Sequence, residues 1–170
     1  IVTMSYGSRR WAALFAVALV PLVHDVWIQK TFSADGAAYF MWLLDTGWFT
    51  DFAWARNHAI FLTQWPVVAA VRSGITDRGV LEAAFGAGLL LPHVLAFALC
   101  VVARRGQPAW PLLFPIAGLL AATLPADGVL TSEHHVAMAF VWPLLFFALR
   151  PDPFTRTDLG LVAALTLAMT

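Results

Sequence analysis

The chain has 170 residues, of which 61% are hydrophobic and 12% are charged, and its formal net charge is zero. A soluble domain of this length usually has about 45–50% apolar and about 25% charged residues, so lipid must solvate part of this chain. Zero net charge gives no basic face for nucleic acid, and the single cysteine, Cys100, excludes a disulfide framework and a cysteine zinc site.

Five apolar runs and the beginning of a sixth follow one another along the chain. A helix that crosses the hydrocarbon layer needs roughly 20 predominantly apolar residues. The sequence therefore predicts an all-α fold, a polytopic transmembrane helical bundle, with spans at about 11–28, 80–103, 109–125, 135–149 and 159–170. We expect residues 1–170 to be the N-terminal transmembrane fragment of a longer protein.

The long segment between the first two spans is also rich in aromatic and aliphatic residues. Its tryptophans suit the headgroup level of a membrane, where an indole ring has both apolar and polar neighbours. We expect two juxtamembrane helices, at about 36–45 and 58–72, that lie along the membrane surface or pack on the spans. The stretch "DTGWFTDF" separates them, and Gly74 ends the second.

Counting Lys and Arg residues tests the topology, because cytoplasmic loops are enriched in both. If the short run 59–71 does not span, six of these residues share the side of the N-terminus and four lie opposite. If it spans, the majority lies opposite the N-terminus. We prefer the first arrangement, which predicts an integral protein of the bacterial inner membrane with a cytoplasmic N-terminus. The six basic residues on the side of the N-terminus are then Arg9, Arg10, Arg104, Arg105, Arg150 and Arg156.

In this layout most acids and histidines lie at the outer ends of the spans or in outer loops. Water around loops explains many such charges, but Asp35 follows the first span closely and lies between the small residues Ser33 and Gly36. A carboxylate at the rim of a low-dielectric region can accept a proton from a hydroxyl group or hold a metal ion. Asp35 is therefore the main candidate for a catalytic group.

A second polar group, Glu133-His134-His135, begins the fourth span, and we expect it at the membrane interface. Ionisable groups at that depth need partners, and Glu and His are ligand types for zinc or manganese. The spacing defines no metal site, so the sequence predicts no definite cofactor and leaves a divalent metal at Glu133 and His134 open. Arg56 and His58 open the second juxtamembrane helix, and Arg56 is a candidate phosphate contact.

Three residues inside the second span have structural explanations. His93 follows Pro92 in mid-span, and we expect it to be a helix-packing residue. Gly86 and Gly88 are expected to permit close contacts between helices.

The order of these parts resembles the N-terminal region of the GT-C membrane glycosyltransferases, which include dolichyl-phosphate-mannose protein mannosyltransferases and lipid A aminoarabinose transferases. In that resemblance "SADGAAYF" supplies an acid at Asp35 and an aromatic residue at Tyr39. "RNHAIFLTQWPVVAAVRSG" is the second surface helix, and "TSEHHVAMAFVWPLLFFAL" is the turn and the fourth span. Gly36 stands where a second acid is usual, and Ala-Ile follows His58 where prolines are usual.

The resemblance implies transfer of a sugar from a polyprenyl-phosphate donor to an acceptor at the extracytoplasmic face, with Asp35 as the general base. The implied partners are the lipid bilayer and the polyprenyl-phosphate-sugar donor. Two alternatives stay open, a membrane transporter and a polytopic membrane protein without catalysis. The implied substrate-binding residues are Tyr39, Arg56, His58, Glu133 and His134.

Overall fold

The computed structural model describes residues 6–28, 32, 35–50, 57–104, 107–123 and 133–169, and these form an all-helical chain. Within these ranges it leaves out the side chains of residues 6–8, 35, 57–58, 122–123, 133–134 and 168–169. The all-α prediction is confirmed. The helices are α1 (Tyr6–Ala18), α2 (Val20–Trp27), α3 (Asp35–Thr46), α4 (Asn57–Arg72), α5 (Arg78–Ala103), η3 (Trp110–Leu112), α6 (Leu113–Thr123), α7 (Glu133–Leu149) and α8 (Arg156–Met169).

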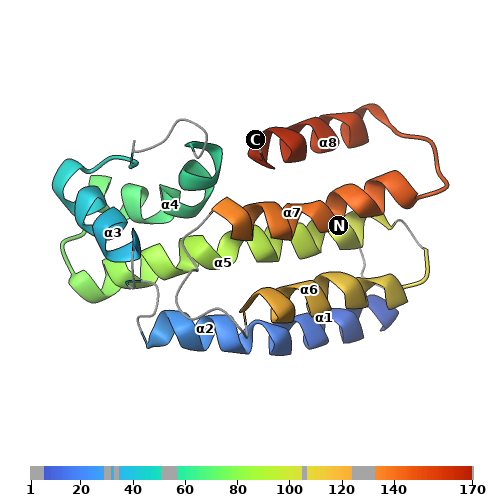
Figure 1. Ribbon diagram of the computed structural model, residues 1–170, viewed down its shortest axis with the longest axis horizontal. Coiled ribbons are helices and arrows are strands. Elements are labelled where there is room, and N and C mark those ends of the chain that lie inside the picture. Colours follow the sequence, from blue (N-terminus) through green and yellow to red (C-terminus); the bar gives the residue numbers. More distant parts are fainter. Residues whose placement is uncertain are drawn as a thin grey trace.

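Helix α5 is the centre of the bundle, and α4 and α7 make the most extensive contacts with it. In Figure 1, α5 and α7 run in one direction, and α1, α2, α6 and α8 run in the other. The first half of α5 extends beyond α6 and α7, and α3 and α4 lie beside that half instead. The bundle therefore has two parts that share α5 as a common axis.

Helix α5 is long because its sequence is apolar almost throughout and its start is capped. The side chain of Asp77 accepts a hydrogen bond of 2.9 Å from the backbone N–H of Val80, which satisfies one of the free donors in the first turn. Pro92 lies inside the helix without ending it. The buried side chains of α5 include Phe85, Leu89 and Cys100, which face the hydrophobic core.

Helices α4 and α5 form an antiparallel hairpin. Gly74 adopts φ +80°, a conformation that favours glycine, and the N–H of Ile75 donates to the carbonyl of Ala70 at 3.1 Å, which closes the end of α4. The chain then reverses and α5 returns along α4. Helix α4 thus packs on α5, which is one of the predicted spans.

Two glycines of α5 allow its neighbours to approach closely. A Cβ atom on Gly88 would overlap the backbone carbonyl of Thr63 in α4, and one on Gly86 would overlap the side chain of Val26 in α2. The predicted role of Gly86 and Gly88 is therefore confirmed. The contact at Gly88 is the more restrictive, because a backbone carbonyl cannot move aside as a side chain can.

Two segments in the described part of the chain are long and apolar enough to cross a membrane, Arg9–Trp27 and Arg78–Ala103. The first includes both α1 and α2, which are separated at Leu19 just before Pro21. The apolar helices in the regions predicted as further spans are shorter, Trp110–Ala121 and His135–Leu149. Membrane association therefore rests on these two segments, and the number of membrane crossings stays a prediction.

Arginines concentrate at one end of the bundle. The first turns of α1 and α8 and the ends of α5 and α7 lie at this end in Figure 1. Arg72 and Arg78, at the turn between α4 and α5, lie at the opposite end. The arginine-rich end carries Arg9, Arg10, Arg104, Arg150 and Arg156.

A buried ion pair closes the corner between α7 and α8. The side chain of Arg150 is 1% exposed, and its Nη2 lies 2.5 Å from Oδ2 of Asp158. Asp158 also accepts from the backbone N–H of Thr155 at 2.7 Å, and its own N–H donates to the Thr155 hydroxyl at 3.3 Å. This reciprocal arrangement is a capping box at the start of α8. The hydrogen bond to Asp158 raises the pKa of Arg150, so this guanidinium is charged across the physiological pH range.

The close contact at Gly88 predicts that replacing this glycine with alanine and replacing Gly160 with alanine have opposite effects on stability. Gly88→Ala should destabilise the protein by about 1–3 kcal/mol, because the added methyl group forces α4 away from α5. Gly160→Ala in α8, where no atom lies within 4 Å of the added Cβ, should stabilise it by about 0.5–1 kcal/mol. Thermal unfolding of the purified protein in detergent measures both, and equal midpoints for the two variants would contradict the close approach.

The ion pair predicts a different effect for two nearby acids. Asp158→Asn keeps the shape of the side chain but leaves the buried Arg150 without its countercharge, so the unfolding midpoint should fall by roughly 5 °C or more. Asp152→Asn removes an exposed acid from the same loop and should change the midpoint little. A similar decrease in both variants would show that the loss is a general charge effect.

Candidate functional site

The residues predicted to form the site lie at the starts of three helices. Asp35 is the first residue of α3, His58 is the second of α4, and Glu133 and His134 are the first two of α7. The structure describes the backbone at these four positions but not the side chains. Arg56 lies outside the described residues. The direction of these side chains is therefore untested, but the positions of their helices can be compared.

The starts of α4 and α7 lie close together. Ala59, the residue after His58, is buried in the same hydrophobic cluster as Val136 of α7 and Ala96 of α5. Helix α4 also contacts both α7 and α8 directly. The backbone at His58 and the first turn of α7 therefore belong to one region, which we call the α4–α7 junction.

The start of α3 lies about two turns nearer the beginning of α5. The ring of Phe40 in α3 is 5.5 Å from that of Phe85 in α5, and the ring of Phe32 is 5.7 Å from that of Phe85. These contacts place α3 beside the first half of α5, nearer the start of α5 than the junction is. Tyr39 is partly buried and packs against the core cluster, so packing accounts for this aromatic residue.

The contact between His93 and His135 shows how far along α5 the α4–α7 junction lies. The rings of His93 and His135 have centroids 6.5 Å apart and are inclined at 70°. His93 is 6% exposed and lies about four turns after the start of α5. The first turn of α7 thus lies level with the middle of α5, and its expected position at the membrane interface stays a prediction.

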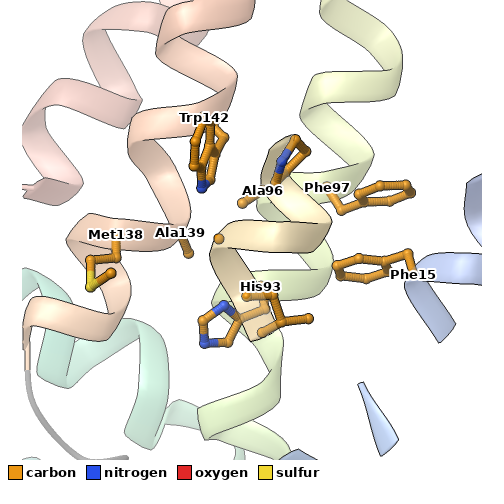
Figure 2. Close-up of a pocket in the computed structure, with 10 residues that line it drawn as sticks. Phe15, His93, Ala96, Phe97, Met138, Ala139 and Trp142 are labelled. Atoms are coloured by element: carbon orange, nitrogen blue, oxygen red, sulfur yellow. The ribbon is translucent and has the colours of Figure 1, made fainter. Parts of the chain in front are cut away.

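A small cavity adjoins the histidine pair (Figure 2). Its volume is about 20 Å³, which is room for about one water molecule, and its walls are mostly apolar. Figure 2 shows His93 and Trp142 on opposite sides of it, with Phe15 beside the ring of Phe97. A sugar or a lipid does not fit into this cavity, so a substrate would have to bind at the junction outside it.

A buried polar pair connects the chain after α3 to α4. Oε1 of Gln64 accepts from the backbone N–H of Thr50 at 3.1 Å, and Nε2 of Gln64 donates to the Thr50 hydroxyl at 2.9 Å. Both residues are less than 4% exposed. Sequence reasoning did not identify this pair, although a glutamine inside the apolar helix at "FLTQWP" is a signal that a partner is needed.

A second buried acid lies in α2. Asp25 is 6% exposed, and its Oδ1 lies 3.8 Å from Nδ1 of His24. Among the described residues no group of three or more His, Cys, Asp or Glu side chains is placed to hold a metal ion. The side chains of Glu133 and His134 are outside that search, so the metal prediction at these two residues is untested.

No family model, no curated protein and no solved structure matches this chain. The function is therefore argued from the chemistry of the residues and from the arrangement of the helices.

The Thr50–Gln64 pair predicts a marked loss of stability when its amide is removed. Gln64→Leu leaves the buried N–H and hydroxyl of Thr50 without their acceptor and should cost about 1–3 kcal/mol. Thr63→Val is the matched control, because that hydroxyl donates within its own helix to the carbonyl of Ala59 and its loss should be nearly neutral. Unfolding of the two purified variants in detergent measures the difference, and a stable Gln64→Leu protein would contradict this role for the pair.

Proposed function

We propose that this chain is the membrane part of a glycosyltransferase that transfers a sugar from a polyprenyl-phosphate donor to an acceptor at the extracytoplasmic membrane face. The observation that supports this proposal is the α4–α7 junction. Helix α4, whose second residue is His58, and helix α7, which starts with Glu133-His134, meet on α5, and α3 lies beside the first half of α5. The starts of helices far apart in the sequence thus lie near the candidate site.

In the proposed reaction an acceptor hydroxyl attacks the anomeric carbon of the donor, and the bond from that carbon to the phosphate oxygen breaks. Asp35 takes the proton of the hydroxyl as the new glycosidic bond forms. The leaving polyprenyl phosphate carries negative charge, which Arg56 and His134 stabilise. Glu133 contributes to this only by helping to hold a divalent cation, because a carboxylate alone repels the phosphate.

The surroundings of the junction suit a lipid-linked donor. Helices α3 and α4 expose large apolar side chains, with Met41 64%, Phe61 60% and Trp65 45% exposed. Such side chains are normally covered in a soluble protein. In the proposed function, bilayer lipid and the polyprenyl tail of the donor cover them, so the sugar phosphate reaches the junction from within the membrane.

The arginine distribution supports an orientation for the proposed enzyme. Arginines gather where α1 and α8 start and where α5 and α7 end. By the positive-inside rule this end faces the cytoplasm, and the junction then lies toward the extracytoplasmic side.

A membrane transporter is the second candidate, and two buried ionisable residues favour it. Asp25 and His93 are each 6% exposed, and each lies in one of the segments long enough to cross a membrane. Ionisable groups inside a bilayer often mark the path of a substrate or a proton.

The glycosyltransferase proposal predicts that Asp35→Asn abolishes turnover. The protein is reconstituted into liposomes with a panel of synthetic polyprenyl-phosphate-linked sugars and a panel of acceptors that carry hydroxyl groups, and release of polyprenyl phosphate is measured. Loss of the general base should lower the rate about 10²–10⁴-fold. Asp45→Asn is the matched control, because Asp45 is an exposed acid in the last turn of the same helix, and it should leave the rate unchanged.

Each other outcome of this assay points to a definite conclusion. If the wild-type protein inserts normally but consumes none of the donors, the glycosyltransferase proposal fails, and the transporter and the polytopic membrane protein without catalysis are left. If Asp35→Asn and Asp45→Asn retain equal activity, the chain is an enzyme whose base is not Asp35.

A further inference from the structure

An apolar groove opens at the arginine-rich end of the bundle, away from the α4–α7 junction. It lies between η3, the start of α6 and the ends of α5 and α7, and its volume is about 400 Å³. Large apolar side chains form its walls, and four of them are well exposed, with Leu149 81%, Trp110 60%, Phe114 47% and Leu145 41% exposed. A volume of this size is in the range of known ligand sites.

The polar part of the groove is cationic. Arg104 and Arg150 line it, and none of its described lining residues is an acid. Nη1 of Arg104 donates to the backbone carbonyl of Gln107, which holds this guanidinium at the wall of the groove. The charge of the wall is therefore complementary to an anion.

Buried contacts hold Arg150 in place. Its Nη2 donates to Asp158 and to the carbonyl of Pro153 at 3.2 Å, and its guanidinium lies 4.8 Å from the ring centre of Phe154. Nε and Nη1 of Arg150 are buried and have no hydrogen-bond partner among the described residues. Arg150 is thus part of the α7–α8 corner, where Asp158 balances its charge, so Arg104 supplies the positive charge of the groove.

We propose that this groove binds an anionic phospholipid of the bilayer, with its phosphate at Arg104 and one acyl chain along Trp110, Phe114, Leu145 and Leu149. Basic pockets between membrane helices on the cytoplasmic side are suited to anionic lipid headgroups, and the charge and apolar walls here match both parts of such a lipid. The site is separate from the α4–α7 junction and does not depend on the proposed catalysis. An anionic lipid bound here would contact the ends of α5 and α7 and the start of α6, and so stabilise their packing.

The test uses quenching of tryptophan fluorescence by brominated lipids, because Trp110 and Trp142 both line the groove. The full chain is placed in mixed micelles with brominated phosphatidylglycerol or with brominated phosphatidylcholine. The difference in quenching between the wild-type protein and Trp110→Phe is the part that comes from Trp110, and it measures lipid in the groove. We expect the anionic lipid to bind there roughly fivefold more tightly than the zwitterionic one, and Arg104→Gln to remove this preference.

Two further variants separate the charge effect from loss of folding. Leu149→Glu places an acid on an exposed wall of the groove, so it should repel the anionic lipid while the bundle stays folded. Arg78→Gln, which removes an exposed arginine at the other end of α5, is the matched control and should keep the preference. Thermal unfolding confirms that each variant is folded.

The proposal is overturned if phosphatidylglycerol and phosphatidylcholine quench Trp110 equally in the wild-type protein. It is overturned as well if both Arg104→Gln and Leu149→Glu keep the full preference. Competition by millimolar inorganic phosphate would also contradict it, because the site would then bind a free anion and not a lipid.

Discussion

The backbone contact between α4 and α5 at Gly88 is the constraint on which the arrangement of the candidate site depends. The absence of a side chain at Gly88 brings the carbonyl of Thr63 against α5, so α4 lies along the first half of that helix. The length of α4 then determines that its start reaches the middle of α5, where α7 begins. If this contact were wider, Ala59 of α4 and Val136 of α7 would no longer belong to one cluster.

Buried polar interactions hold the bundle at two corners. Gln64 bonds to Thr50 where the chain leaves α3, and Asp158 bonds to Arg150 where it passes from α7 to α8. Apolar packing alone does not select one angle between two helices. A buried polar pair does, because any other angle would separate the donor from its acceptor, and a buried group without its partner costs free energy. These two pairs therefore define how the loops, and the helices after them, are placed on α5.

The two ends of the bundle differ in chemistry. One half carries the acids and histidines at the starts of α3, α4 and α7, and the other end carries most of the described arginines. The proposed catalysis uses the first and the proposed lipid site uses the second. Helix α5 connects them, so an anionic lipid at Arg104 would stabilise the helix on which the junction is built.

Local signals in the sequence were enough to predict the helices. The apolar runs and Gly74 after α4 act within a few residues, and the predicted range 80–103 differs from Arg78–Ala103 by only two residues at its start. The cap by Asp77 is also local, but it was not predicted. The roles of Gly86 and Gly88 were predicted from residue type alone, because only a residue without a side chain lets a neighbouring helix approach so closely. The capping box at "TRTD" had a readable local pattern but was missed.

The sequence by itself determined that the chain is helical, apolar and built around long hydrophobic segments, because these properties follow from composition and short-range periodicity. Only the tertiary structure decided that His93 meets His135, that Gln64 meets Thr50 and that Arg150 is buried against Asp158. The partners of the first two pairs come from different segments of the chain, and Arg150 is buried only when α7 and α8 pack together. Which surfaces of the helices meet depends on helix lengths and close contacts summed over the whole bundle, and no single stretch of sequence contains that information.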